Sequence, residues 1–322
     1  MQLSYLNNIP DRPYLDLLSP VKFNPIFIMG CPRSGTTFLY QTLVLTKCFD
    51  FVSAYHIIKY DELLYNHVKQ IETQVRKELD LLFESLRITN RGIDNVSVGS
   101  NSPEEYGFVV SGYEFDLSSK NLPRLIELCR KVQFISQLKQ PLLLKSTYFQ
   151  ALTLLSQTFP EARFIFIHRH PLAAINSSLK INRSLWSRKN AYVALISQDY
   201  QQILDNIWQR TFKWLSYSQY FELGLRRITK KYIEEVNFFL DNVESLPQQS
   251  YISVRYEDLC GQPETTVQNI LKFLGLSAKV TLDYEKLSEP RPLNLLPEVK
   301  KESEKIIKQL QSYLVYCGYE LS

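Results

Sequence analysis

Two glycines five residues apart enclose a polar loop with the residue types needed to bind a phosphate. Gly30 and Gly35 bracket the sequence CPRS, which follows an apolar run at 26–29 and precedes a helical pattern from Thr36. A glycine turn between a buried strand and a helix directs backbone N–H groups toward one point, so the loop predicts an anion site. The spacing follows the nucleotide-binding pattern G-x-x-x-x-G-K-[ST], but Thr36 takes the place of the lysine and the cation Arg33 lies inside the loop.

Cys31, in the same loop, raises the alternative of a phosphatase, in which a thiolate attacks a phosphate among backbone amides. That chemistry needs an arginine six residues after the cysteine, and Thr37 occupies this position. The sequence therefore favours binding of an anion by the loop over attack by Cys31.

Two further apolar runs lead into a cation. The run PLLLK at 141–145 ends in Lys145, and ARFIFIH at 162–168 is followed by Arg169. In open α/β sheets the ligand lies beyond the carboxyl ends of the strands, so these residues and Arg33 are expected at one edge of a sheet. Three cations at that edge predict a polyanionic ligand.

The elements that must position these residues alternate between strands and helices. Strands are expected at 26–29, 49–54, 141–145, 162–168 and 250–254, and helices at 36–46, 61–86, 123–138, 149–159, 172–179, 191–223, 226–240, 263–274 and 297–316. Residues 1–24 are expected to be an irregular lead-in, 91–103 a loop, and 277–322 a C-terminal helical extension. This alternation predicts an α/β fold with a mainly parallel sheet and helices on both faces, in one domain over 1–322.

Composition excludes several classes of protein. The 37 basic and 33 acidic residues give a net charge of +4 without a block of like charge, so a nucleic-acid partner is not indicated. Five scattered cysteines lack the spacing of metal ligands and favour a reducing compartment. No signal-peptide pattern or apolar run of membrane-spanning length is found, so we expect a cytoplasmic protein with no membrane span and no metal.

Several motifs resemble those of one enzyme family. The loop sequence PRSGTT is similar to the 5′-phosphosulfate loop of sulfotransferases that use 3′-phosphoadenosine 5′-phosphosulfate (PAPS). The segment LLKSTYFQALTLLSQTFPEARFIFIHRHPLAAINSS resembles their pattern of strand-end lysine, FPxAxF, R-x-x-P and serine, with Arg169 and Ser177 eight residues apart. Residues 251–276 resemble a late strand and FLGL helix, and 91–108 a segment of a broad bacterial branch. The resemblance covers about 25–276 and implies a three-layer fold similar to that of P-loop proteins.

The resemblance implies a role for each matching residue. Lys145 would neutralise charge on the bridging oxygen as the sulfuryl group leaves PAPS, with 3′,5′-diphosphoadenosine as product. The acceptor would be a hydroxyl or amine of a small molecule, glycan or lipid, and the oligomeric state is not indicated. The residues implied in cofactor binding are Arg33, Ser34, Gly35, Thr36 and Thr37 for the 5′-phosphate side, and Arg169 and Ser177 for the 3′-phosphate.

Two candidates for the general base remain. Relatives often carry proline and then histidine after the strand-end lysine, whereas Ser146 and Thr147 follow Lys145 here. Glu105 matches an acidic position of the bacterial branch, although the Tyr106 and Gly107 that follow depart from it. His56 lies 23 residues after Arg33, near the place of a catalytic glutamate in other branches, and imidazole titrates near neutral pH.

Two other functions compete with a sulfotransferase. A P-loop nucleotide kinase or NTPase would need the loop lysine and a magnesium-binding aspartate, but the chain has Thr36 and, after the strand at 162–168, Arg169. A catalytically silent relative that binds PAPS would keep the loop and lose turnover.

Overall fold

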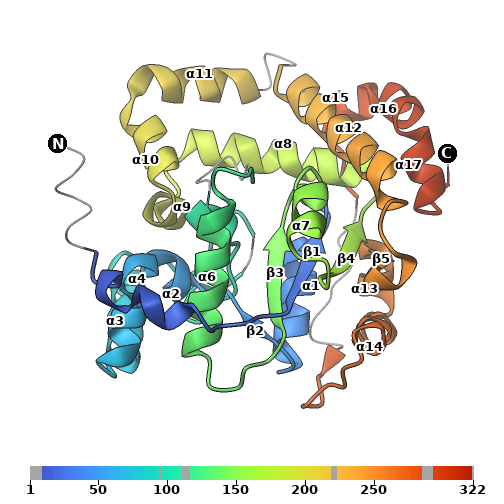
Figure 1. Cartoon of the computed structure of the whole chain (residues 1–322). Coiled ribbons are helices and arrows are strands. Elements are labelled where there is room, and N and C mark those ends of the chain that lie inside the picture. The colour runs from blue at the N-terminus through green and yellow to red at the C-terminus, as the bar shows by residue number, and fades with distance from the viewer. Residues whose placement is uncertain (1–8, 95, 111–116, 219–222, 285–292, 321–322) are drawn as a thin grey trace. The chain divides into compact units, whose positions relative to one another are not determined.

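The computed structural model describes residues 9–94, 96–110, 117–218, 223–284 and 293–320. The chain divides into two compact units, each assembled from three segments. Figure 1 shows its helices and strands. The first unit comprises 1–25, 49–144 and 190–201, and the second comprises 26–48, 145–189 and 202–322. The expected single domain over 1–322 stays a prediction.

The strands form one parallel sheet in the order β2-β3-β1-β4-β5. Their bounds are β1 (Pro25–Met29), β2 (Asp50–Phe51), β3 (Leu142–Ser146), β4 (Arg163–His168) and β5 (Tyr251–Arg255). In the second unit β4 pairs in parallel with β1 on one side and β5 on the other, with Phe164 opposite Phe27 and Tyr251. The predicted α/β fold with a mainly parallel sheet is confirmed.

The core of the second unit is built from apolar strands and aromatic rings. All five residues of β1 are buried. The ring of Phe27 stacks on that of Phe164 with centroids 5.7 Å apart, and Phe149 packs on Phe239 at 4.5 Å. Burial of such rings is a large part of the free energy that holds a strand in a sheet. The ends of β1 and β4, where Arg33 and Arg169 follow, therefore rest on a rigid core.

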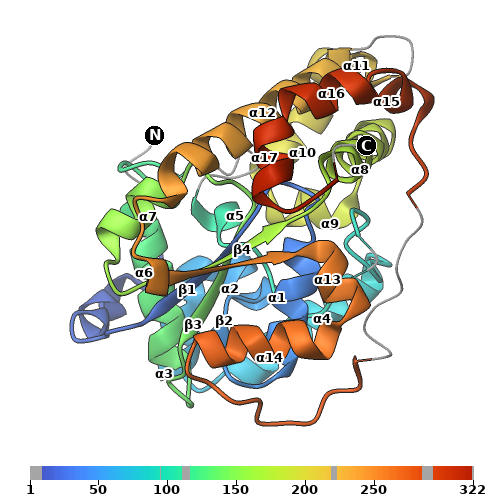
Figure 2. The same ribbon diagram turned by 90° about the vertical axis from the view of Figure 1, so that its right-hand side faces the viewer.

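The helices are divided between the two units. In the first unit they are η2 (Arg12–Leu18), α2 (Ala54–Ile58), η3 (Tyr60–Glu62), α3 (Leu63–Val68), α4 (Glu72–Ser85), α5 (Gly107–Val110), α6 (Leu122–Ile135) and α9 (Ala191–Ile196). In the second they are α1 (Thr36–Leu45), α7 (Leu152–Thr158), α8 (Pro171–Ser187), α11 (Ile207–Tyr217), α12 (Leu223–Val243), η5 (Gln248–Ser250), α13 (Tyr256–Gly261), α14 (Pro263–Phe273), α15 (Pro297–Lys301), α16 (Ser303–Gln309) and α17 (Gln311–Tyr316). The helix α10 (Gln198–Asp205) belongs in part to each. In the second unit α17 packs on both α12 and α16 (Figure 2).

Three long helices expected from the sequence are interrupted. The pattern at 61–86 forms η3, α3 and α4, because Gln70 takes a left-handed conformation with φ 58° and the Ile71 N–H bonds the Asn66 carbonyl, as at a helix C-terminus. Asn206 accepts hydrogen bonds from the N–H groups of Trp208 and Gln209, which starts α11 as a new helix within 191–223. The stretch 297–316 forms α15, α16 and α17. Residues 219–222, which belong to the helix expected at 191–223, lie outside the described residues.

Smaller corrections concern strands and the lead-in. The strand expected at 49–54 is only the two residues of β2, since Ser53 already caps α2. The lead-in contains the 3-10 helix η2. Within the described ranges, no helix has both the length and the apolar composition needed to cross a membrane.

Candidate active site

The loop after β1 is held by close packing at its two glycines. A Cβ atom on Gly30 would lie 2.5 Å from the carbonyl oxygen of Ile167 in β4, and one on Gly35 would overlap the ring of Tyr256. Gly35 also has φ 99°, a left-handed conformation that favours glycine. The loop backbone therefore has little freedom at either end.

The helix that follows this loop begins without a side-chain cap. Gly35 is the N-cap of α1 and offers no hydroxyl or carboxylate to the first N–H groups. Ser34 is 1% exposed, and in the described part of the chain its Oγ has no hydrogen-bond partner. Uncapped N–H groups with a buried hydroxyl beside them are the donors that an anion at a helix N-terminus satisfies.

Three residues predicted to bind the cofactor come together in the second unit. The Arg33 Nε donates to the Oγ of Ser177 over 3.1 Å, although the two residues are 144 positions apart. The Nη1 of Arg169 donates a hydrogen bond to the carbonyl oxygen of Arg33 over 3.0 Å. The Arg169 Nε is buried and, among the described residues, has no hydrogen-bond partner. This arrangement gathers two guanidinium groups and a hydroxyl at the loop.

Lys145 reaches the same loop–helix junction from β3. Its side chain is 1% exposed, and its Nζ donates to the Oγ1 of Thr37 over 2.7 Å. Thr37 lies in the first turn of α1, so the lysine charge stands at the positive end of that helix dipole. Both the burial and the dipole disfavour a cation there.

Tyr256 is a candidate site residue that sequence reasoning missed. It begins α13 directly after β5, and its ring lies under the Arg169 guanidinium with 4.4 Å between Cζ and the ring centroid. The ring also lies against Gly35 and, edge-on, Phe38. Its place at the carboxyl end of a strand was the signal that could have found it.

Glu235 is a second residue that sequence reasoning missed. Its carboxylate, 1% exposed on α12, accepts hydrogen bonds from the backbone N–H groups of Phe149 at 2.6 Å and Gln150 at 3.3 Å. Burial raises the pKa of Glu235 to about 7, and these hydrogen bonds oppose the rise. Glu235 therefore secures the segment that follows Lys145. The sequence signal for Glu235 was an acidic residue among the apolar residues of a helical pattern.

The base candidate Glu105 belongs to a buried charge cluster in the first unit. Arg91 is 1% exposed and lies 3.1 Å from Glu104, 3.8 Å from Asp94 and 3.9 Å from Glu105, measured between side-chain nitrogen and oxygen atoms. Burial alone would lower the pKa of Arg91, but the carboxylates reverse this effect and raise it. Neither glutamate lies in a helical turn, since α5 begins at Gly107.

The other candidate, His56, has a structural contact. Its Nδ1 accepts a hydrogen bond from the Ser53 backbone N–H over 3.0 Å, as part of a capping box at the start of α2. Burial and, to a smaller extent, the charge of Arg76 lower the pKa of His56 to about 3. The neutral ring therefore carries its proton on Nε2, and its only lone pair is already used.

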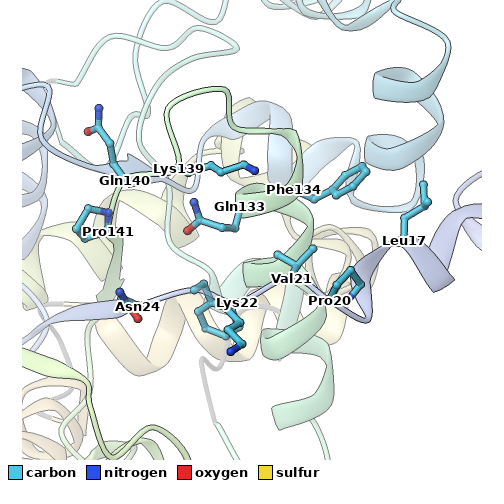
Figure 3. A pocket seen from close by; sticks show the side chains of 11 residues that line it. Leu17, Pro20, Val21, Lys22, Asn24, Gln133, Phe134, Lys139, Gln140 and Pro141 are labelled. Carbon is cyan, nitrogen blue, oxygen red and sulfur yellow. The ribbon is translucent and has the colours of Figure 1, made fainter.

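A cavity of about 500 Å³ lies elsewhere in the first unit (Figure 3). It is bounded by the chain before β1, including Leu17 and Val21, and by Phe134 of α6 and the segment after it. None of the predicted site residues lines it. In the described ranges, no group of three or more histidine, cysteine, aspartate or glutamate side chains is arranged to hold a metal ion.

An α/β fold whose glycine loop gathers cations at a helix N-terminus is suited to binding an anion. Residues 25–223 and 205–279 match the family model described as "Sulfotransferase family". The match covers most of the chain, which therefore belongs to the sulfotransferase family.

Curated relatives and solved structures agree with this assignment. The chain is 23% identical over 280 residues to the omega-hydroxy-beta-dihydromenaquinone-9 sulfotransferases of Mycobacterium bovis and Mycobacterium tuberculosis; this covers 78% of the chain and only 63% of each relative. A sulfotransferase structure from Mycobacterium avium matches with a TM-score of 0.63 and 17% identity over 97% of this chain and 81% of that one. A second, from Mycobacterium tuberculosis, matches with 0.58 and 14% over 94% and 80%. The structures show a shared fold.

We expect the substitution Gly35→Ala to destabilise the chain by roughly 2 kcal/mol or more, because alanine is strained at φ 99° and its methyl group overlaps the Tyr256 ring. The free energy of unfolding in urea measures the effect. Gly261→Ala is the matched control, since an added Cβ there has nothing within 4 Å, and its change is expected to stay within about 0.5 kcal/mol. Equal stability of the two variants would contradict the close packing at the loop.

Proposed function

We propose that this chain transfers the sulfuryl group of PAPS to a hydroxyl or amine of an acceptor molecule. The observation that supports this most is the gathering of Arg33, Arg169 and Ser177 beside the uncapped N-terminus of α1. Membership of the sulfotransferase family supports the reaction type.

The residues present fit a nucleotide with phosphates at both ends. Ser34 Oγ and Arg169 Nε are buried donors that lack a partner among the described residues, and a phosphate oxygen would satisfy them. In the proposal, residues 33–37 hold the 5′-phosphate side, and Arg169 and Ser177 hold the 3′-phosphate. PAPS supplies an activated sulfuryl group, and 3′,5′-diphosphoadenosine is the product that leaves.

Lys145 and a general base would act in the transfer step itself. Sulfuryl transfer, like phosphoryl transfer, depends mainly on positioning and on charge stabilisation. We assign Lys145 to the charge that develops on the bridging oxygen, because its ammonium group is buried at the start of α1. Between the base candidates we favour Glu105, since the Nδ1 lone pair of His56 is engaged by Ser53.

The acceptor is proposed only as a class. The curated relatives are named for an omega-hydroxylated menaquinone, so a hydroxylated lipid stands beside small molecules and glycans as a candidate. A screen of acceptors with radiolabelled PAPS tests the class directly. Tight binding of 3′,5′-diphosphoadenosine without dependence on ATP or magnesium would exclude a nucleotide kinase, and any turnover would exclude a silent relative.

We expect Arg33→Ala and Arg169→Ala each to weaken binding of 3′,5′-diphosphoadenosine by about 1.5–3 kcal/mol, the range for a lost hydrogen bond to a charged group. Ser177→Ala, which removes one neutral donor, should cost about 1 kcal/mol. Isothermal titration calorimetry measures both. Arg188→Ala, an exposed arginine after the other end of α8, is the control. Unchanged affinity in both loop-side arginine variants would refute the cofactor site.

Lys145→Ala should lower kcat by roughly 10²–10³-fold while weakening PAPS binding much less, because its charge matters most where negative charge develops. Steady-state kinetics with separately measured PAPS affinity distinguish the two effects. Lys272→Ala, an exposed lysine on α14, controls for a general loss of positive charge. A variant with normal kcat and reduced affinity alone would limit Lys145 to cofactor binding.

The general base is tested with Glu105→Gln and His56→Asn. We expect Glu105→Gln to lose roughly 10²–10⁴-fold in kcat with unchanged binding of 3′,5′-diphosphoadenosine. His56→Asn should retain most turnover and lose stability instead, since the ring caps α2. The opposite result, with turnover lost only in His56→Asn, would transfer the role to the histidine. Near-normal turnover in both variants would exclude both residues.

A further inference from the structure

The helix α11, in the second unit, exposes its apolar residues. Trp208 is 82% exposed, Phe212 65% and Ile207 64%, and the Trp214 and Leu215 side chains are also exposed. Helical spacing places Trp208, Phe212 and Leu215 on one face. Large apolar side chains exposed together on one face of a helix point to a site of interaction.

The opposite face of α11 carries cations toward the protein. Arg210 and Lys213 are half-buried, and the Lys213 Nζ lies 5.6 Å from the ring centroid of Trp186 in α8. The helix packs on α8 and α12, and Figures 1 and 2 show it beyond α8 as seen from β4. An amphipathic helix of a globular protein turns its apolar face to the core, so this orientation is the reverse of the usual one.

The surroundings of the apolar face are positively charged. The stretches 207–217 and 223–231 contain no aspartate or glutamate. The cations at the start of α12 are Arg226, Arg227, Lys230 and Lys231, of which Lys230 pairs with Glu234 over 3.7 Å. Since α11 and α12 pack together, these charges lie on the helix next to α11. Trp, Phe, Ile and Leu on one side of a helix with Lys and Arg around it characterise a helix that lies in a membrane interface.

We propose that α11 and the start of α12 dock on an anionic lipid surface. Charge complementarity favours this partner, since each Lys or Arg near such a surface adds to the attraction. A second copy of the chain is a poorer partner, because a two-fold interface would place this surface against itself and bring its cations together. The helix would lie flat, with Trp208 and Phe212 among the acyl chains.

The test is co-sedimentation of the full chain with vesicles of phosphatidylcholine, alone or mixed with phosphatidylglycerol. We expect binding to the mixed vesicles, with a blue shift of tryptophan emission, and weaker binding at high salt. The double variant Trp208→Ser/Phe212→Ser should bind at least about tenfold more weakly, since two large rings no longer leave water. Arg227→Gln/Lys230→Gln should weaken binding by about fivefold for each charge removed.

The control is Leu81→Ser/Leu138→Ser, which removes two exposed leucines of the first unit and should bind as the parent chain does. Thermal melts of all variants check that they fold. Equal vesicle binding by the parent and the Trp208→Ser/Phe212→Ser variant would overturn the proposal. So would dimers, in analytical ultracentrifugation, that form only with Trp208 and Phe212 present while no chain binds vesicles, because the surface would then pair copies of the chain.

Discussion

Close packing of the loop after β1 is the constraint on which the candidate site depends. At Gly30 the loop backbone lies too close to the carbonyl of Ile167 for a side chain, and at Gly35 it lies against the Tyr256 ring. Rigid ends leave Arg33 in a left-handed conformation with φ 69°, which is uncommon for a residue with a side chain. In this position its carbonyl meets Arg169 and its Nε meets Ser177.

Buried cationic side chains have different partners in the two units. In the first, Arg91 is surrounded by the carboxylates of Glu104, Glu105 and Asp94. In the second, Arg169 donates to the carbonyl oxygen of Arg33 and Lys145 to the hydroxyl of Thr37, at the start of α1. The Arg169 Nε is buried without a hydrogen-bond partner among the described residues, and an anionic ligand would satisfy it. We therefore propose the second unit as the place of the cofactor.

Secondary structure was predicted well where a single short sequence pattern decides it. The apolar strands at 26–29 and 162–168 and the helix from Thr36 were confirmed. A buried strand is recognised from a run of neighbouring apolar residues, and a glycine turn from a few residues next to it. Three helical patterns were predicted as single helices but are interrupted, whereas the long helix predicted at 226–240 is found as α12. Periodicity continued through 61–86, but the left-handed Gln70 ends one helix and a second begins two residues later. Such breaks depend on capping and packing that periodicity does not report.

The sequence by itself determined the family motifs, the loop, the lysine at the end of β3 and the arginine after β4, since these follow from residues close together in the chain. The tertiary structure alone decided which of them meet. Arg33 bonds Ser177 across 144 positions, and Glu235 holds the backbone at Phe149 from a distant helix. It also decided that His56 caps a helix and that α11 turns its rings outward. The physical reason is that side-chain partners and exposure are set by packing between distant segments, which no local pattern encodes.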